Sequence, residues 1–170
     1  RYRPSNSSTI TKGTFCIPSA LHTITVTGGG TTEEKTRIKL GAFENLPYVT
    51  TVCLGDAVTG VDEVAFSGCN ALRTVNLPQG ADTIGTQAFH SCMSLKEITI
   101  PDGVKTIGNE AFVNCTGLKT VYMGSGVESI GLWAFRDSFG CAVHIKDVAA
   151  WCAIAFDGYS ANPLCNGTLY

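Results

Sequence analysis

The stretch CMSLKEITIPDGVKTIGNEAF, which runs from Cys92 to Phe112, decides the fold because its pattern recurs along the chain. Ala-Phe pairs follow one another at constant intervals of 23 residues, at Ala42-Phe43, Ala65-Phe66, Ala88-Phe89, Ala111-Phe112 and Ala134-Phe135. Apolar residues return at the sixth, ninth, eleventh, fifteenth and eighteenth places after the first four of these phenylalanines. A unit this short cannot bury its own apolar residues, so neighbouring units must stack into one continuous core. The sequence therefore predicts a solenoid.

Each repeat contains one segment that is typical of a short β-strand. Apolar and polar residues alternate from Glu97 to Ile100, and Pro101 then ends the segment because proline cannot donate to a β-ladder. Six such strands are expected, centred on Ile24, Val52, Val75, Ile98, Val121 and Val143. At about 4.8 Å per strand they would form one parallel sheet roughly 25 to 30 Å wide. The rest of each repeat is expected to form tight bends, marked by Gly85, Gly108 and Gly131.

The repeats extend beyond the regular region on both sides. Phe15 begins an earlier repeat that is longer by five residues, with the insertion at Gly28 to Glu34. After Phe135 the pattern degrades, because Val143 and Ile145 fit it only if one residue is deleted. We therefore expect a single domain over residues 1–170. It comprises an N-terminal segment 1–42 with one irregular repeat, four regular repeats over 43–135, and a degenerate repeat with a C-terminal cap over 136–170.

The C-terminal segment has the pattern of a capping helix. Asp147 is a typical N-cap residue, and apolar residues recur behind it at helical spacing, at Val148, Trp151, Cys152, Ala155 and Phe156. An open solenoid needs its terminal strand covered, because a bare edge pairs with other molecules. We therefore expect Trp151 and Phe156 to lie in the core of this cap.

Three of the eight cysteines occupy the same place in successive repeats, since Cys69, Cys92 and Cys115 each follow a repeat phenylalanine by three residues. A free cysteine in such an inward position behaves as a small hydrophobic residue whose thiol donates weakly to a backbone carbonyl. We expect these three thiols to be buried and structural. Cys53 lies between two inward strand residues, so strand alternation points it outward.

The other cysteines outside this series include three in the C-terminal segment, Cys141, Cys152 and Cys165. In an extracellular protein a Cys141–Cys152 or Cys152–Cys165 disulfide would hold the cap in place, while plain buried thiols are the equal alternative. Together with His144 these cysteines offer four potential zinc ligands, but their spacing is not that of a known zinc finger. We predict no metal site.

Composition limits the classes of partner. Charged residues make up 15% of the chain and the net charge is −2, which provides no broad positive field for nucleic acid or anionic lipid. No apolar run is long enough to span a membrane, and the first nine residues lack the apolar stretch of a signal peptide. The chain contains no catalytic or cofactor-binding motif such as a P-loop, a G-x-S-x-G elbow or H-E-x-x-H. We expect neither enzymatic activity nor a cofactor.

The phrase Cys-x-x-Leu-x-x-Val-x-Leu-Pro-x-x-Val-x-x-Ile-Gly-x-x-Ala-Phe resembles the BspA-type leucine-rich repeat of bacterial and protist surface proteins. The resemblance covers about Phe15 to Ile145 and is most specific in the middle four repeats. It implies a leucine-rich-repeat solenoid, a curved right-handed array of about six repeats. A short-stranded parallel sheet would line the concave face, and a cap would close the C-terminal end.

The outward strand positions supply the candidate binding residues. Arg73, Lys96 and Lys119 share one column, where like charges either stay solvated or form a shallow basic strip for an acidic partner. Glu97 lies beside this strip, and Tyr122 and His144 add the aromatic character that is common at binding hot spots.

The resemblance also implies a function for these residues. It suggests a non-catalytic protein-binding module of a secreted or cell-surface bacterial protein, which adheres to host or matrix proteins through the concave sheet. The alternative is a structural spacer within a larger surface protein, with no ligand of its own. A protein ligand and a monomeric state are expected, without nucleic-acid binding or membrane insertion.

Overall fold

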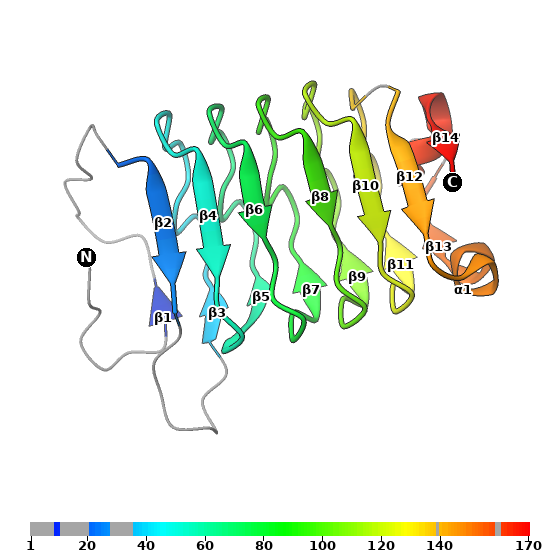
Figure 1. Cartoon of the computed structure of the whole chain (residues 1–170), viewed down its shortest axis with the longest axis horizontal. Coiled ribbons are helices and arrows are strands. Elements are labelled where there is room, and N and C mark those ends of the chain that lie inside the picture. The colour runs from blue at the N-terminus through cyan, green and yellow to red at the C-terminus, as the bar shows by residue number, and fades with distance from the viewer. Residues whose placement is uncertain (1–8, 11–20, 28–35, 139, 159–160) are drawn as a thin grey trace.

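Each regular repeat contributes two β-strands, so the expectation of one strand per repeat is wrong (Figure 1). The computed structural model describes residues 9–10, 21–27, 36–138, 140–158 and 161–170. One set of strands lies on what we call the front face: β2 (Thr23–Val26), β4 (Thr51–Leu54), β6 (Thr74–Asn76), β8 (Glu97–Thr99), β10 (Thr120–Met123), β12 (Ala142–Ile145) and β14 (Thr168–Leu169). The other set forms what we call the back sheet: β1 (Thr9–Ile10), β3 (Thr36–Ile38), β5 (Val58–Val61), β7 (Thr83–Ile84), β9 (Thr106–Ile107), β11 (Ser129–Ile130) and β13 (Ala155–Phe156). Phe15 and the expected insertion at Gly28 to Glu34 lie outside the described residues.

The six strand centres predicted from the periodicity are confirmed. All lie on front-face strands with side chains at most 8% exposed: Ile24, Val52, Val75, Ile98, Val121 and Val143. Their register keeps equivalent residues side by side, as Ile98, Val121 and Val143 show. The back sheet supplies a matching fully buried row of Val61, Ile84, Ile107 and Ile130. Both rows belong to one apolar core.

The front face is not the single sheet that the sequence predicts. Strands β2, β4 and β6 form one parallel sheet, and β8, β10, β12 and β14 form another. β6 and β8 are nevertheless neighbours on the same face (Figure 1). The back sheet continues without a break through all seven of its described strands.

The bends of each repeat rely on residues with left-handed backbone rather than on the predicted glycines. In successive repeats these residues form pairs four positions apart, as at Gln87 and Ser91, with φ of 55° and 58°. Gly108 has no such φ; its place requires glycine because a Cβ there would lie 2.6 Å from the backbone nitrogen of Thr86 in the preceding repeat. The conserved spacing of Gly85, Gly108 and Gly131 therefore marks close contact between repeats, not chain reversal.

The inside of the solenoid holds a column of stacked rings and a ladder of thiols. Successive phenylalanines from Phe43 to Phe135 stack with centroids 5.0 to 5.5 Å apart. The predicted burial of Cys69, Cys92 and Cys115 is confirmed, and each Sγ donates to a carbonyl of the preceding repeat, that of Phe43, Phe66 and Phe89 respectively. Ser138 continues this ladder, since its hydroxyl donates to the Phe112 carbonyl at 2.9 Å. Cys53 is half-buried on β4, at an outward position as predicted.

The C-terminal end carries the predicted helix in shortened form. Helix α1 spans Val148–Ala153, and the Asp147 carboxylate accepts hydrogen bonds from the backbone N–H groups of Ala149 and Ala150, which confirms the N-cap. Phe156 lies beyond the helix, in β13, because the chain returns there to the back sheet. The buried Trp151 ring meets Phe156 edge-on at 5.6 Å, so the two residues pack together as expected. A 3₁₀ helix, Pro163–Asn166, then leads into β14.

Candidate functional site

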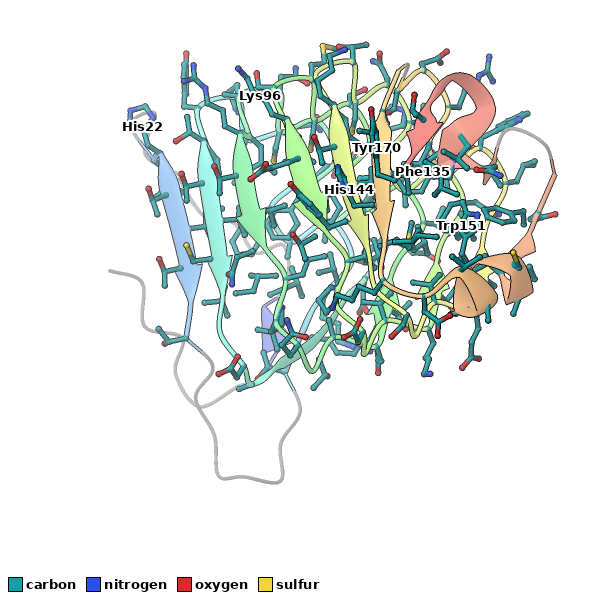
Figure 2. The ribbon with its side chains drawn as sticks, turned by 45° about the vertical axis from the view of Figure 1, so that its right-hand side comes forward. His22, Lys96, Phe135, His144, Trp151 and Tyr170 are labelled. Carbon is teal, nitrogen blue, oxygen red and sulfur yellow. The ribbon has the colours of Figure 1, made fainter. Side chains whose placement is uncertain are left out.

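The basic column lies at the start of the front-face strands. Arg73, Lys96 and Lys119 each precede a strand, and the backbone N–H of Lys119 donates to the Lys96 carbonyl at 2.8 Å. All three side chains are exposed, and none of them forms an ion pair with another described residue. Lys96 extends from the edge of the face in Figure 2. Three cations are therefore available to a partner.

Glu97 adds one negative charge beside this column. It begins β8, lies opposite Thr120 of β10 and points outward from the strand. Its carboxylate forms no ion pair with a described residue. The strand starts therefore carry three positive charges with one negative charge beside them.

Aromatic rings stack across the last three front-face strands. Tyr122 and His144 are in register on β10 and β12, with ring centroids 5.0 Å apart, and His144 and Tyr170 are 5.1 Å apart (Figure 2). Backbone hydrogen bonds hold Tyr170 beside β12, because its N–H donates to the Val143 carbonyl at 2.8 Å and its carbonyl accepts from the Ile145 N–H at 3.1 Å. Tyr122 and Tyr170 are 41% and 66% exposed. We call these three residues the aromatic stack.

Tyr170 is the member of the stack that sequence reasoning missed. Its signal was available, because Thr168-Leu169-Tyr170 repeats the order of Thr120-Val121-Tyr122, an apolar residue followed by an aromatic one. The six residues that sequence reasoning did select lie on the consecutive front-face strands β6, β8, β10 and β12 or directly before them. The basic column and the aromatic stack meet on β10, where Lys119 and Tyr122 are three residues apart.

The structure describes two of the three C-terminal cysteines, for which the sequence left a disulfide and plain buried thiols as equal alternatives. Cys141 is buried and Cys152 is exposed, and both are free thiols. The Cys141 Sγ donates to the carbonyls of Leu118 and Ser138, each at 3.2 Å. Burial raises the pKa of this thiol, and the charge of Lys119 opposes the shift only in part. The side chain of Cys165 lies outside the described residues.

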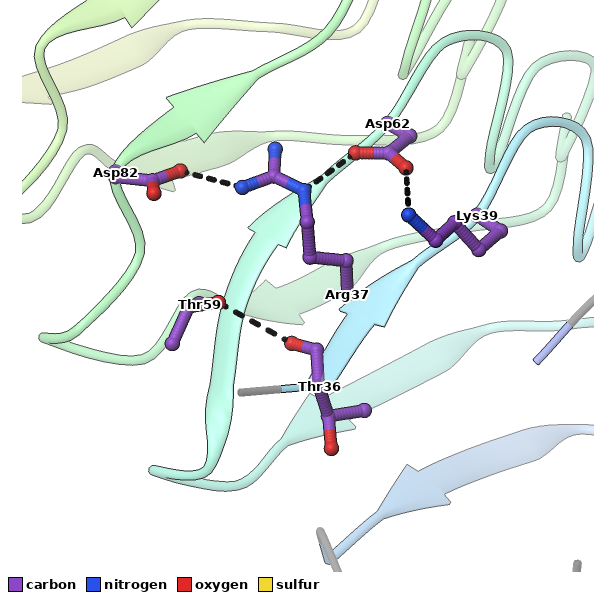
Figure 3. Close-up of polar contacts among 6 residues, drawn as sticks. All are labelled: Thr36, Arg37, Lys39, Thr59, Asp62 and Asp82. Carbon is purple, nitrogen blue, oxygen red and sulfur yellow. Dashed lines mark hydrogen bonds and ion pairs between the residues drawn. The ribbon is translucent and has the colours of Figure 1, made fainter. Parts of the chain in front are cut away.

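A second polar cluster lies on the back sheet, where sequence reasoning selected nothing (Figure 3). The Arg37 guanidinium donates to Asp62 at 2.7 Å and to Asp82 at 2.8 Å, and Lys39 pairs with Asp62 at 3.4 Å. Arg37 reaches across Gly60, where a Cβ would lie 2.5 Å from a guanidinium nitrogen. Burial opposes ionisation of Asp82, yet hydrogen bonds from Arg37 and Thr83 hold the pKa of Asp82 below its usual value. This cluster ties three successive repeats together.

The described side chains do not gather into a metal site. Over the described ranges no group of three or more His, Cys, Asp or Glu residues is placed to hold an ion. In that same part of the chain, no helix has the length and apolar character needed to cross a bilayer.

Comparison with known families identifies the repeat. Residues 36–149 match the model of the BspA type leucine rich repeat region, in six copies. The chain belongs to the BspA-type leucine-rich repeat family. A comparison with curated proteins finds no match to this BspA-type domain.

Solved leucine-rich repeat structures are similar to this BspA-type domain. A leucine-rich cell surface protein from Faecalibacterium prausnitzii A2-165 aligns with a TM-score of 0.73 and 26% identity, over 84% of this chain and 38% of its own. The leucine-rich repeat protein of T. pallidum aligns at 0.64 and 31% identity, over 71% of this chain and 58% of its own. The pneumococcal vaccine antigen PcpA, at 0.61 and 22% identity over 86% of this chain and 34% of its own, shares the fold. The BspA-type domain thus spans less than two thirds of each of these proteins.

Proposed function

We propose that this domain is a non-catalytic protein-binding module of a secreted or cell-surface bacterial protein. Its front face would bind an acidic patch on a host or matrix protein. The cell-surface description of the Faecalibacterium prausnitzii protein, which is 26% identical, supports the location. Repeat solenoids present extended surfaces of this kind for binding other proteins, which supports the activity.

The aromatic stack is the observation that carries the proposal. Aromatic side chains bury large areas at low entropic cost and are enriched at the centres of protein interfaces. Tyr122 and Tyr170 instead expose 41% and 66% of their area, one on each side of His144 in the stack. The register of β10 and β12 holds Tyr122 and His144 in place before any partner arrives, so binding them requires little further ordering.

The basic column supports the acidic character of the partner. Arg73, Lys96 and Lys119 point into solvent without a carboxylate partner among the described residues. Unpaired cations at the rim of an interface steer an acidic surface toward it and set its orientation, more than they add to affinity. Because the net charge of the chain is −2, the basic column attracts anions only locally.

The raised pKa values of the buried thiols support a non-catalytic role. The thiols whose pKa burial raises are those of Cys69, Cys92, Cys115 and Cys141, all inside the core. A raised pKa keeps a thiol protonated and weakly nucleophilic at neutral pH, and burial keeps substrates away from it.

A binding assay with matched variants tests the proposal. The wild-type domain is passed over a panel of purified extracellular-matrix proteins, beside a Tyr122→Ala/Tyr170→Ala variant and a Trp133→Ala control. Trp133 is also exposed, at 39%, but lies beside Arg136 in the segment between β11 and β12, outside the front-face strands. We expect the stack variant to bind about thirtyfold more weakly, as for the loss of a hot spot of roughly 2 kcal/mol, and the control to bind as the wild type does.

Two results would argue against this function. Equal binding by the stack variant and the wild type would place the interface elsewhere. Failure of the folded wild-type domain to bind any protein of the panel would favour the spacer alternative, in which the repeats only separate other parts of a larger protein.

A further inference from the structure

The front face contains a seam between β6 and β8. The backbone N–H of Arg73 donates to the Thr50 carbonyl at 2.9 Å on one side, and that of Lys119 donates to the Lys96 carbonyl at 2.8 Å on the other. The equivalent bond between Lys96 and Arg73 is absent from the backbone bonds of the described residues. β6 and β8 therefore sit side by side as the edges of two separate sheets.

Burial of the core residues marks the same place. Val75 and Leu77 are 8% and 7% exposed, although their equivalents in the next repeat, Ile98 and Ile100, are each 1% exposed. Ile24, on the terminal strand β2, is 7% exposed. The core side chains of β6 thus have the exposure of a strand at the end of the sheet, even though β8 follows it.

Two adjacent prolines explain the seam. The residue that follows the eleventh position of each repeat is Gly55, Pro78, Pro101 and Gly124 in turn. Where it is glycine the repeats approach closely: the Gly55 N–H donates to the Val26 carbonyl at 2.7 Å, and a Cβ on Gly124 would lie 2.5 Å from the Pro101 carbonyl oxygen. Proline has no N–H to donate and a ring that needs space. The seam lies between the two neighbouring repeats that both have proline at this position, Pro78 and Pro101.

The back of the same two repeats is closed. Strands β7 and β9 pair in register, and the Gly108 N–H donates to the Ile84 carbonyl at 2.8 Å. The Phe66 and Phe89 rings remain stacked at 5.5 Å. An array that is bonded on one side and unbonded on the other has the mechanical arrangement of a hinge.

We infer that the solenoid opens and closes at the β6–β8 seam, with the back sheet as the pivot. Arg73 and Lys96 lie on opposite sides of the seam, whereas Lys96 and Lys119 are held together by a backbone hydrogen bond. Opening therefore changes the distance between Arg73 and Lys96 and leaves the distance between Lys96 and Lys119 unchanged. This inference does not depend on the proposed function, because it concerns the free chain.

Residue-resolved amide hydrogen exchange tests the seam in the free protein. Thr120, in β10, donates to the Lys96 carbonyl, and the equivalent amide of β8 is that of Glu97, which faces β6. We expect Glu97 to exchange about tenfold or more faster than Thr120, and the pivot amide of Gly108, which donates to the Ile84 carbonyl, to remain protected. A Pro101→Gly variant supplies the missing N–H and space, so it should slow exchange at Glu97. Equal protection of Glu97 and Thr120 in the wild type would overturn the inference.

Cross-linking separates motion from a static gap. Thr74→Cys/Glu97→Cys places a cysteine pair across the seam, and Glu97→Cys/Thr120→Cys places a matched pair across the intact β8–β10 ladder. A closed parallel pair has the Cα separation that a disulfide needs, so both pairs should bridge under mild oxidant, the seam pair severalfold more slowly. Equal rates, or no bridge at all across the seam, would contradict a hinge that opens and closes.

Discussion

Val64 carries a backbone conformation that its side chain does not favour. Its φ is 48°, in the left-handed region, where the equivalent residues of other repeats are Gly41, Gln87, Glu110 and Trp133. A β-branched residue in this region is the least tolerated of these, whereas asparagine visits it readily. The repeat imposes this conformation on Val64 because the stacking of neighbouring turns requires it.

We therefore predict that Val64→Asn stabilises the domain. The expected gain is about 0.5 to 1 kcal/mol in the free energy of unfolding, measured by urea denaturation. Val113→Asn is the control, since Val113 is also half-buried but is not among the residues with positive φ. A loss of stability in Val64→Asn as large as that in the control would refute the assignment of strain.

The ladder thiols predict how stability depends on pH. Burial raises the pKa of Cys69 to about 11 and that of Cys115 to about 12, from 9.0 for an ordinary thiol. The folded state thus holds these protons more tightly than the unfolded state does, so the stabilisation is complete below about pH 9 and is lost as pH rises toward 11 and 12. We expect the urea midpoint to fall across this range.

Substitution of the ladder isolates this contribution from other groups that titrate at high pH. In Cys69→Ser/Cys115→Ser the hydroxyls do not ionise, and Ser138 shows that a serine fits the ladder and donates to the same kind of carbonyl. The variant should lose less stability between pH 9 and 11 than the wild type. Identical pH profiles for the two proteins would contradict the account.

Individual residues differ in how far the sequence could predict them. The burial of Cys92 followed from its 23-residue spacing, because equivalent places in a repeat have equivalent surroundings. The contact between Arg37 and Asp82 joins residues 45 positions apart in different columns, and no spacing rule brings them together. It depends on the back sheet and on the space left by Gly60.

At the scale of elements, the back strands hold neighbouring repeats at close range. Strand β9 ends at Ile107, and Gly108 follows it directly against the backbone of the preceding repeat. Strands of two residues are too short to show an alternating pattern, so the sequence predicts only bends in these segments. Only the stacking of equivalent residues turns them into a sheet, as the pairing of Ile84 with Ile107 shows.

A glycine substitution tests this close contact. We predict that Gly108→Ala destabilises the domain by about 1 to 3 kcal/mol, because the added Cβ would lie 2.6 Å from the backbone nitrogen of Thr86. Gly80→Ala is the matched control, because its Cβ would meet nothing nearer than the Asp56 carbonyl oxygen at 3.6 Å. Chemical denaturation compares the two variants, and equal stability would show that the repeats are not in close contact there.

For the whole molecule, the repeat period determined most of the architecture. It predicted the stacked core and the six front-face strand centres, while the helical spacing after Asp147 predicted the cap. The break between β6 and β8 was not predicted, since it arises only where Pro78 meets Pro101 across neighbouring repeats. The sequence did not point to Tyr170 as part of the aromatic stack, because Tyr170 follows β14, beyond the last recognisable repeat.

The central claim is that the front face of this domain binds an acidic protein. The most direct measurement is the dissociation constant of a captured matrix protein for wild type, for Arg73→Glu/Lys96→Glu/Lys119→Glu, and for the control Lys105→Glu. Lys105 is exposed and belongs to the back of the repeat, where it pairs with Glu128 at 3.0 Å. We predict at least a tenfold weaker affinity for the triple variant and an affinity within about twofold of wild type for the control. An unchanged affinity in the triple variant, with the fold intact by circular dichroism, would contradict the claim.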